Sequence, residues 1–429
     1  MPPNEPIIEG RTALKAWLES YPPLPDMVLT PDVIDARDDL AYVRGTFSFT
    51  MPAVDEKEPE KDVGKLLWIL MKNQVGKWQI KVENYNSDLP FPESVSGSPI
   101  EKPEASAKSP EQYFYTIEQG VQMGNIKMIP IETPKGTFNV WTKRFGNNPR
   151  IKLLLLHGGP GSTHEYFECM ENFLPKEGIE FIYYDQLGSA YSDQPEDPSL
   201  WDLERFVDEV EQVRKVLSLN KDNFYLLGHS WGGWLAIEYA LKYKENIKGL
   251  ILSNTMASNP DYGKYADEVL AKQMDPVVLE KIRKLEEKSD FENPQYMELL
   301  IPNYYEKHLC RMPSAQWPDP LLRAFNKLNS QVYVLLQGPS EFGISGKLEL
   351  WDRTSEINKI KVPTLTIGAK YDTMDPDHLK WIASEVENGS FLYCPNGSHM
   401  CMYDDQITYM NGLIKFIREV DSGKKTVTF

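Results

Sequence analysis

Two patterns of hydrophobic and polar positions divide the chain. In the first 90 residues, apolar and polar side chains alternate along "DLAYVRGTFSFTMP" and "GKWQIKVENYN", and the stretch "VGKLLWILMK" between them is almost continuously apolar. Alternation with a period of two is typical of strands that bury one face. The pattern predicts three consecutive strands in an antiparallel meander, preceded by a helix at "GRTALKAWLESY".

The segment that follows has no apolar periodicity. Residues 88–110, "DLPFPESVSGSPIEKPEASAKSP", contain five prolines and several serines, which is the composition of an exposed linker. We therefore predict a small α+β accessory domain with an antiparallel sheet over residues 1–90, a linker over 91–110, and a separate domain from residue 111.

From residue 111 onward, short apolar runs alternate with stretches of helical spacing. "SLWDLERFVDEVEQVRKVLSL", for example, repeats apolar residues every three or four positions, as an amphipathic helix does. Buried strands are predicted within "RIKLLLLHGG", "IEFIYYDQLG", "NFYLLGHS", "IKGLILSNT" and "VPTLTIGAKYD". This alternation predicts an α/β fold with a doubly wound, mostly parallel sheet over residues 111–256 and 356–429.

Residues 257–355 interrupt the sheet pattern. This segment is rich in helix-forming residues, and "DEVLAKQMDPVVLEKIRKLEEKSD" and "PQYMELLIPNYYEKHLCR" have the spacing of amphipathic helices. We expect the segment to form a helical cap over the catalytic residues proposed below.

Composition narrows the possible functions. The 46 Lys and Arg residues against 63 Asp and Glu residues give a net charge of −17, and no basic stripe stands out, which disfavours nucleic acid and anionic membrane as partners. The four cysteines lack CxxC spacing, so neither a metal site nor a disulfide framework is indicated. The start of the chain has no basic segment followed by an apolar run, and we expect a cytoplasmic protein.

The sequence around Ser230 carries the strongest chemical signal. Gly228, Ser230 and Gly232 fit the pattern G-x-S-x-G between a predicted strand and a helix predicted from about 231 to 243. In that context the pattern predicts a sharp turn that exposes a nucleophilic serine, with glycines beside it for steric room. The alternative is a serine that only caps the helix.

A serine hydroxyl attacks a carbonyl when a base takes its proton, so a histidine held by a carboxylate is required. His399 lies in the loop after the last predicted strand, where the order nucleophile, acid, histidine places the base. Asp372, near the end of the preceding strand, is the predicted acid. Asp375 is the alternative, although Asp followed by Pro is a common helix start.

Acyl transfer also needs N–H donors for a developing oxyanion. The N–H of Trp231, directly after the serine, is one expected donor. The second is expected from the glycine loop "HGGPG" at 157–161, where we favour Gly159 over Gly158. The alternative is that this loop is only a tight turn.

Several of these stretches resemble one family. "LLLLHGGPGSTHEYF", "YYDQLGSAYSD", "LLGHSWGGWLAIEYAL" and "QGPSEFGISGKLELWD" resemble the proline iminopeptidases, also called prolyl aminopeptidases, over about residues 110–420. The resemblance implies the α/β-hydrolase fold and a cap glutamate, here Glu341, that binds the free amino terminus of the substrate. An α-amino group has a pKa of ~7.7 to 8.0, so it is largely protonated at neutral pH and pairs with a carboxylate.

One position departs from the family. Some relatives carry a second glutamate directly after the catalytic aspartate, where this chain has Thr373. Amine recognition is then expected to be weaker or to use another cap carboxylate such as Glu306, for which a charge on a solvated helix face is the alternative interpretation. Asp185 and Gln186 match the family and are expected to support the loop that follows them.

The N-terminal stretches "AYVRGTFSFT" and "GKWQIKVENYNSDLP" resemble the later part of the SnoaL-like class of α+β rolls. Domains of that class open with a long helix across the sheet, and nothing precedes "MPPNEP" to supply it. We therefore expect an incomplete domain or a sheet covered by a partner. The resemblance implies a structural or dimerising module and a homo-oligomer formed through it, with a separate catalytic or ligand-binding site as the alternative.

Together these features predict a serine aminopeptidase that releases an N-terminal proline or small apolar residue from short peptides or aminoacyl amides through an acyl-enzyme. No metal or organic cofactor is expected. The nearest alternative is an amino-acid amidase, esterase or lactonase of the same fold. From a different class, the alternative is a catalytically idle scaffold built around the N-terminal domain.

Overall fold

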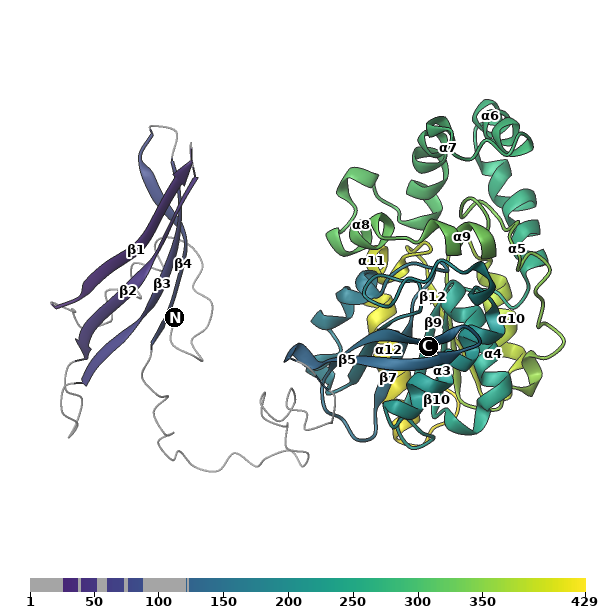
Figure 1. Cartoon of the computed structure of the whole chain (residues 1–429), viewed down its shortest axis with the longest axis horizontal. Coiled ribbons are helices and arrows are strands. Elements are labelled where there is room, and N and C mark those ends of the chain that lie inside the picture. Colours follow the sequence, from purple (N-terminus) through teal and green to yellow (C-terminus); the bar gives the residue numbers. More distant parts are fainter. Residues whose placement is uncertain (1–25, 38–39, 52–59, 73–75, 88–120, 122) are drawn as a thin grey trace. The chain divides into compact units, whose positions relative to one another are not determined.

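The computed structural model describes residues 26–37, 40–51, 60–72, 76–87, 121 and 123–429 (Figure 1). The chain divides into two compact units, Met1–Glu104 and Ala105–Phe429. The predicted helix at "GRTALKAWLESY" and the predicted linker lie outside the described residues.

The first unit contains a four-stranded antiparallel sheet whose strands pair in chain order. The strands are β1 (Val28–Arg37), β2 (Leu40–Met51), β3 (Glu60–Lys72) and β4 (Trp78–Ser87). The last three are the strands that the sequence predicts.

Strand β1 was not predicted, because Pro31 interrupts its pattern. The register against β2 shifts between Pro31 and Val33. Proline lacks an N–H for the ladder and is tolerated at an edge or a bulge, and β1 is an edge strand. Alternation along β2 and β3 buries Phe47 and Leu66 and leaves Tyr42 and Leu67 exposed. Membership of the SnoaL-like class stays a prediction.

The second unit is built around an eight-stranded sheet in the order β12-β11-β10-β9-β7-β8-β6-β5. The strands from β7 to β12 run parallel, whereas β6 pairs antiparallel with both β8 and β5. The strand bounds are β5 (Ile126–Thr133), β6 (Gly136–Phe145), β7 (Lys152–Leu156), β8 (Glu180–Asp185), β9 (Phe224–His229), β10 (Gly249–Ser253), β11 (Thr364–Ala369) and β12 (Gly389–Cys394). The predicted fold class is confirmed, and β5 and β6 are additions to it.

Helices cover both faces of this sheet, so successive strand residues enter different cores. Leu153 and Leu155 of β7 belong to one apolar cluster, and Leu154 and Leu156 to the other. Strands buried on both faces need the continuous apolar runs seen in the sequence. The packed helices are α3 (Leu203–Val216), α4 (Trp231–Tyr243), α10 (Pro376–Glu385), α11 (Cys401–Asp404) and α12 (Gln406–Asp421).

The segment between β10 and β11 is helical and groups on one side of the unit (Figure 1). Its α-helices are α5 (Asn259–Tyr265), α6 (Pro276–Glu287), α7 (Pro294–Leu300), α8 (Asp319–Asn326) and α9 (Ser330–Leu336), and a π-helical stretch spans Ile301–Leu309. The local sequence determines where several of these helices begin. Asp275, for example, caps α6 by accepting a hydrogen bond from the N–H of Val277, and a proline occupies the first position of that helix. In the described part of the chain, no helix is long and apolar enough to cross a membrane.

Candidate active site

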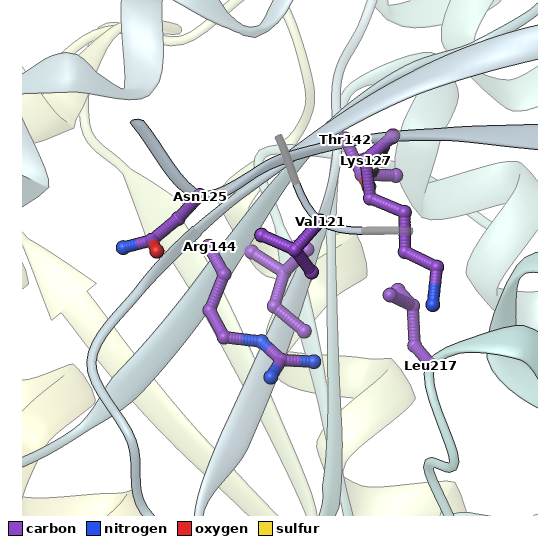
Figure 2. Close-up of a pocket in the computed structure, with 7 residues that line it drawn as sticks. Val121, Asn125, Lys127, Thr142, Arg144 and Leu217 are labelled. Atoms are coloured by element: carbon purple, nitrogen blue, oxygen red, sulfur yellow. Dashed lines mark hydrogen bonds between the residues drawn. The ribbon is translucent and has the colours of Figure 1, made fainter. Parts of the chain in front are cut away.

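A cavity of about 230 Å³ beneath the helical segment brings together residues from distant parts of the chain. Gly159, Ser230, Glu341 and His399 all line it. Figure 2 shows a different pocket, on the antiparallel side of the sheet, which contains none of the predicted site residues. That pocket is lined by Val121, Asn125, Lys127, Thr142, Arg144, Ile182 and Leu217.

Ser230 occupies a strained turn between β9 and α4. Its backbone has φ 57° and ψ −125°, a combination that a residue with a side chain rarely adopts. Gly228 and Gly232 make the turn possible, because a Cβ on Gly228 would lie 2.0 Å from the Gly232 carbonyl oxygen. A Cβ on Gly232 would lie 2.1 Å from the Leu156 carbonyl oxygen on β7.

His399 and Asp372 meet behind the serine. His399 Nδ1 donates to Asp372 Oδ1 at 2.8 Å, which leaves Nε2 as the lone-pair nitrogen. Both side chains are buried. Ser230 Oγ makes no hydrogen bond to another described residue, and such bonds often tighten only when substrate binds.

Asp372 is held by more than the histidine. Its Oδ1 accepts the N–H of Met374 at 3.0 Å, and its Oδ2 accepts Asn254 Nδ2 at 2.7 Å. Asp375 instead accepts the N–H of Asp377 at 2.9 Å and caps α10. The structure therefore brings Asp372, and not Asp375, to His399.

Burial and neighbouring charge set the protonation of the site. Burial lowers the pKa of His399, but the charge and hydrogen bond of Asp372, together with the charges of Glu341 and Asp404, outweigh burial, so the pKa lies above the ordinary value of 6.5. Burial raises the pKa of Glu341, against the charge of His399 and a hydrogen bond from Tyr333. Burial also holds the pKa of His229 well below 6.5.

His229 is consequently neutral, and its contacts identify its tautomer. Its Nε2 donates to the His399 carbonyl oxygen at 2.9 Å, so its Nδ1 accepts from the Tyr166 hydroxyl at 3.2 Å. The same Tyr166 oxygen accepts the N–H of Gly158 at 2.5 Å. The N–H of Gly158 is thus engaged, which favours Gly159 as an oxyanion donor.

Gln186 connects the two segments expected to form the oxyanion hole. Its Oε1 accepts Trp231 Nε1 at 2.9 Å, and its Nε2 donates to the His157 carbonyl oxygen at 3.0 Å. The Gln186 side chain therefore fixes the start of helix α4 relative to the glycine loop at 157–161. The family resemblance implied that Gln186 supports the loop that follows it, but it did not imply this bridge.

Glu341 is surrounded by tyrosines that sequence reasoning did not identify. Tyr333 donates to Glu341 Oε1 at 2.7 Å, and Tyr262 donates to the Glu341 carbonyl oxygen at 2.7 Å. The Glu341 N–H donates to the Tyr305 hydroxyl at 3.1 Å. These residues come from three helical segments of the cap, so only the tertiary fold brings them together.

Thr373, which replaces the second glutamate of some relatives, and Glu306, the alternative carboxylate for the amine, lie in different surroundings. Thr373 Oγ1 is 3.1 Å from His399 Nδ1 and 3.4 Å from Asp372 Oδ1, so it contacts both of these side chains. Glu306 does not line the cavity, and its Oε1 accepts the N–H of Ser314 at 2.7 Å. Among the described residues, no group of three or more His, Cys, Asp or Glu side chains is placed to hold a metal ion.

The chain is similar to proteins of known families. The family described as "alpha/beta hydrolase fold" matches residues 152–405. The proline iminopeptidase of Flavobacterium johnsoniae is 63% identical over 297 residues, which are 69% of this chain and 99% of that protein. The proline iminopeptidase of Elizabethkingia meningoseptica is 59% identical, with the same shares.

A solved structure supports the fold. The crystal structure of a proline iminopeptidase from Mycobacterium smegmatis matches with a TM-score of 0.62 at 23% identity. The match covers 69% of this chain and 99% of that chain.

The close packing at the turn that carries Ser230 can be tested by adding a methyl group at Gly232. We expect Gly232→Ala to lower the free energy of unfolding by about 3 kcal/mol, because the added methyl would collide with a backbone carbonyl that cannot move freely. Thermal unfolding measures the loss. Gly263→Ala is the matched control: it lies in helix α5 with nothing within 4 Å of the added methyl, and should be neutral or slightly stabilising.

The protonation of His399 gives a second prediction. If His399 activates Ser230, the rate of serine labelling by a fluorophosphonate should rise with pH through a pKa above 6.5, because only the neutral imidazole accepts the proton. A pH-independent rate between about pH 5 and 9 would contradict it. Ser230→Ala should abolish labelling.

Proposed function

The chain belongs to the proline iminopeptidase family of α/β hydrolases, and we propose that it is a serine aminopeptidase which releases an N-terminal proline or small apolar residue from short peptides. One observation carries this proposal: the carboxylate-bearing Glu341 lines the same cavity as Ser230 and His399. A nucleophile, its base and a buried acceptor for a cation thus face one space.

In this proposal Ser230 attacks the carbonyl of the first residue while His399 takes its proton. Asp372 stabilises the imidazolium that forms and keeps Nδ1 protonated. His399 then protonates the leaving amine, the ester bond to Ser230 remains, and water attacks it with His399 again as base. The products are a free amino acid and a peptide shortened by one residue.

The oxyanion of each tetrahedral intermediate would be bound by the backbone N–H groups of Gly159 and Trp231. Backbone donors at a rigid turn need no reorganisation as charge develops. The Gln186 bridge supports this assignment, because it joins the loop of one donor to the side chain of the other.

Glu341 would select the free amino terminus. Its carboxylate receives one hydrogen bond from another described residue, that of Tyr333, so further acceptor capacity remains. An ammonium group supplies the missing positive charge, whereas an internal peptide bond would leave a buried carboxylate unpaired.

The remaining walls favour a compact apolar first residue. Apolar side chains line the cavity beside the catalytic groups, among them Met297, Leu309, Leu321, Phe325 and Leu328. Burying a proline ring or a small aliphatic side chain against them is favourable, whereas a charged side chain would find no counter-ion among these five residues.

The amidase, esterase or lactonase alternative keeps the same nucleophile but does not need an amine. Thr373 is the observation in its favour, because that position supplies a hydroxyl instead of a second carboxylate. Hydrolysis of aminoacyl anilides and their N-blocked counterparts separates the two functions. Equal turnover of blocked and free substrates would refute the aminopeptidase.

Removing the nucleophile tests the chemistry itself. We expect Ser230→Ala to lower kcat for prolyl or alanyl anilides by about 10³-fold or more, since it removes the attacking atom. Binding of the product amino acid should persist, measured by calorimetry. Full activity in the variant would exclude Ser230 as the nucleophile.

Neutralising Glu341 tests substrate choice. We expect Glu341→Gln to reduce kcat/KM on free-amine anilides by about 10²-fold, because a buried charge pair with the ammonium is lost, and to change little on amine-free esters. Glu306→Gln is the matched control, because that carboxylate lies outside the cavity. Equal losses on both substrate classes would remove Glu341 from amine binding.

A further inference from the structure

Asn254 directly follows strand β10, where it lies among all three catalytic segments. Its backbone has a φ of 50°, in the left-handed region that Asn tolerates better than most residues, and its side chain is fully buried. The backbone N–H donates to the Ile367 carbonyl oxygen on β11 at 2.9 Å. The preceding residue, Ser253, accepts the N–H of Ser230 at 3.1 Å.

The amide nitrogen of Asn254 faces the acid and the histidine loop. Its Nδ2 donates to Asp372 Oδ2 at 2.7 Å and to the Ser398 carbonyl oxygen at 3.3 Å. These acceptors account for both amide hydrogens. One belongs to the carboxylate that holds His399, and the other belongs to the residue before His399.

The amide oxygen is held from the opposite side. Asn254 Oδ1 accepts the Ser253 hydroxyl at 2.8 Å and the Cys401 thiol at 3.2 Å. Two donors meet the oxygen and two acceptors meet the nitrogen, so this network determines which way the amide is turned. The side chain has no alternative orientation that satisfies all four partners.

We propose that Asn254 is a positioning residue of the catalytic triad, which fixes the Asp372 carboxylate so that Oδ1 points at His399 Nδ1. The inference rests on the proposed role of Ser230, Asp372 and His399. With Oδ2 bound to Asn254 and Oδ1 bound to His399, the carboxylate is held at both oxygens and cannot rotate about its Cβ–Cγ bond.

Because the amide is neutral, it orients the carboxylate without cancelling its charge. A lysine or arginine at this position would orient Asp372 as well, but would oppose the positive charge that develops on His399. The titratable groups facing this network are His229, His308, His399, Glu341, Asp372, Cys394, Cys401, Asp404, Tyr262, Tyr265, Tyr304 and Tyr409, and burial lowers the pKa of His308 below 6.5. None of them is a cation at neutral pH apart from His399 itself in its protonated form.

The test replaces the donor while keeping the shape. In Asn254→Asp the new carboxyl faces Asp372, and two carboxyl groups at this distance share one proton. While the proton is present the new group still donates; once it is lost, both carboxylates repel. We therefore expect kcat to fall by about 10²-fold at neutral pH with KM within about twofold of the wild type.

The pH profile separates positioning from a merely structural effect. The ratio of Asn254→Asp activity to wild-type activity should fall as pH rises, because the shared proton is lost. Asn259→Asp is the matched control: Asn259 is also a buried asparagine, but its Nδ2 donates to the Leu348 carbonyl oxygen. This control should lose stability while its activity ratio stays flat with pH.

A folded Asn254→Asp enzyme with wild-type kcat, or with a pH-independent ratio like that of the control, would overturn the inference. If Asn254→Asp fails to fold, Ser253→Ala tests the inference instead, since it removes one hydrogen-bond donor to Asn254 Oδ1. It should lower kcat by about two- to tenfold at constant KM, and an unchanged kcat would overturn the inference.

Ser230→Ala distinguishes this inference from the proposed function. If that variant is inactive and Asn254→Asp behaves as the wild type, only the role of Asn254 fails. If Ser230→Ala retains hydrolysis, the proposed triad fails and the inference fails with it.

Discussion

The backbone of Ser230 is the constraint on which the site depends. A residue with a side chain can hold a positive φ here only because β9, α4 and β7 approach to distances that exclude any side chain on Gly228 or Gly232. The free-energy cost of this strained turn is offset by the packing of two apolar cores against the sheet. The sheet is therefore more than a support for loops, because its close packing fixes where the serine hydroxyl lies.

Much of this arrangement could be predicted because it is local in sequence. The turn at Ser230 follows from two glycines between a strand and a helix, and Asp375 was recognised as a helix cap from the proline after it. The strands β7 to β11 are predicted by their continuous apolar runs, which are needed only where helices cover both faces of a sheet. In each case, residues within a few positions of one another carry the information.

The unpredicted parts depend on contacts between distant residues. Strands β5 and β6 pair antiparallel at the edge of the sheet and lack the apolar runs of the central strands. Asn254 and Asp372 are 118 residues apart in sequence, and Trp231 and Gln186 are 45 apart. No periodicity links such pairs. The SnoaL-like assignment and the expected oligomer also stay predictions, since the four-stranded sheet alone fixes neither.

The two buried carboxylates of the site differ in how fully they are satisfied. Asp372 accepts from His399, Asn254 and the Met374 N–H, so it is rigid and has little capacity left. Within the described residues the Glu341 carboxylate accepts a hydrogen bond from Tyr333 alone, and burial raises its pKa. A carboxylate saturated by protein donors is suited to orient a base. One that retains free lone pairs in a cavity gains most from a cation that arrives with the substrate. Hydrogen-bond satisfaction therefore gives a physical reason to assign orientation of the base to Asp372 and recognition of the amine to Glu341.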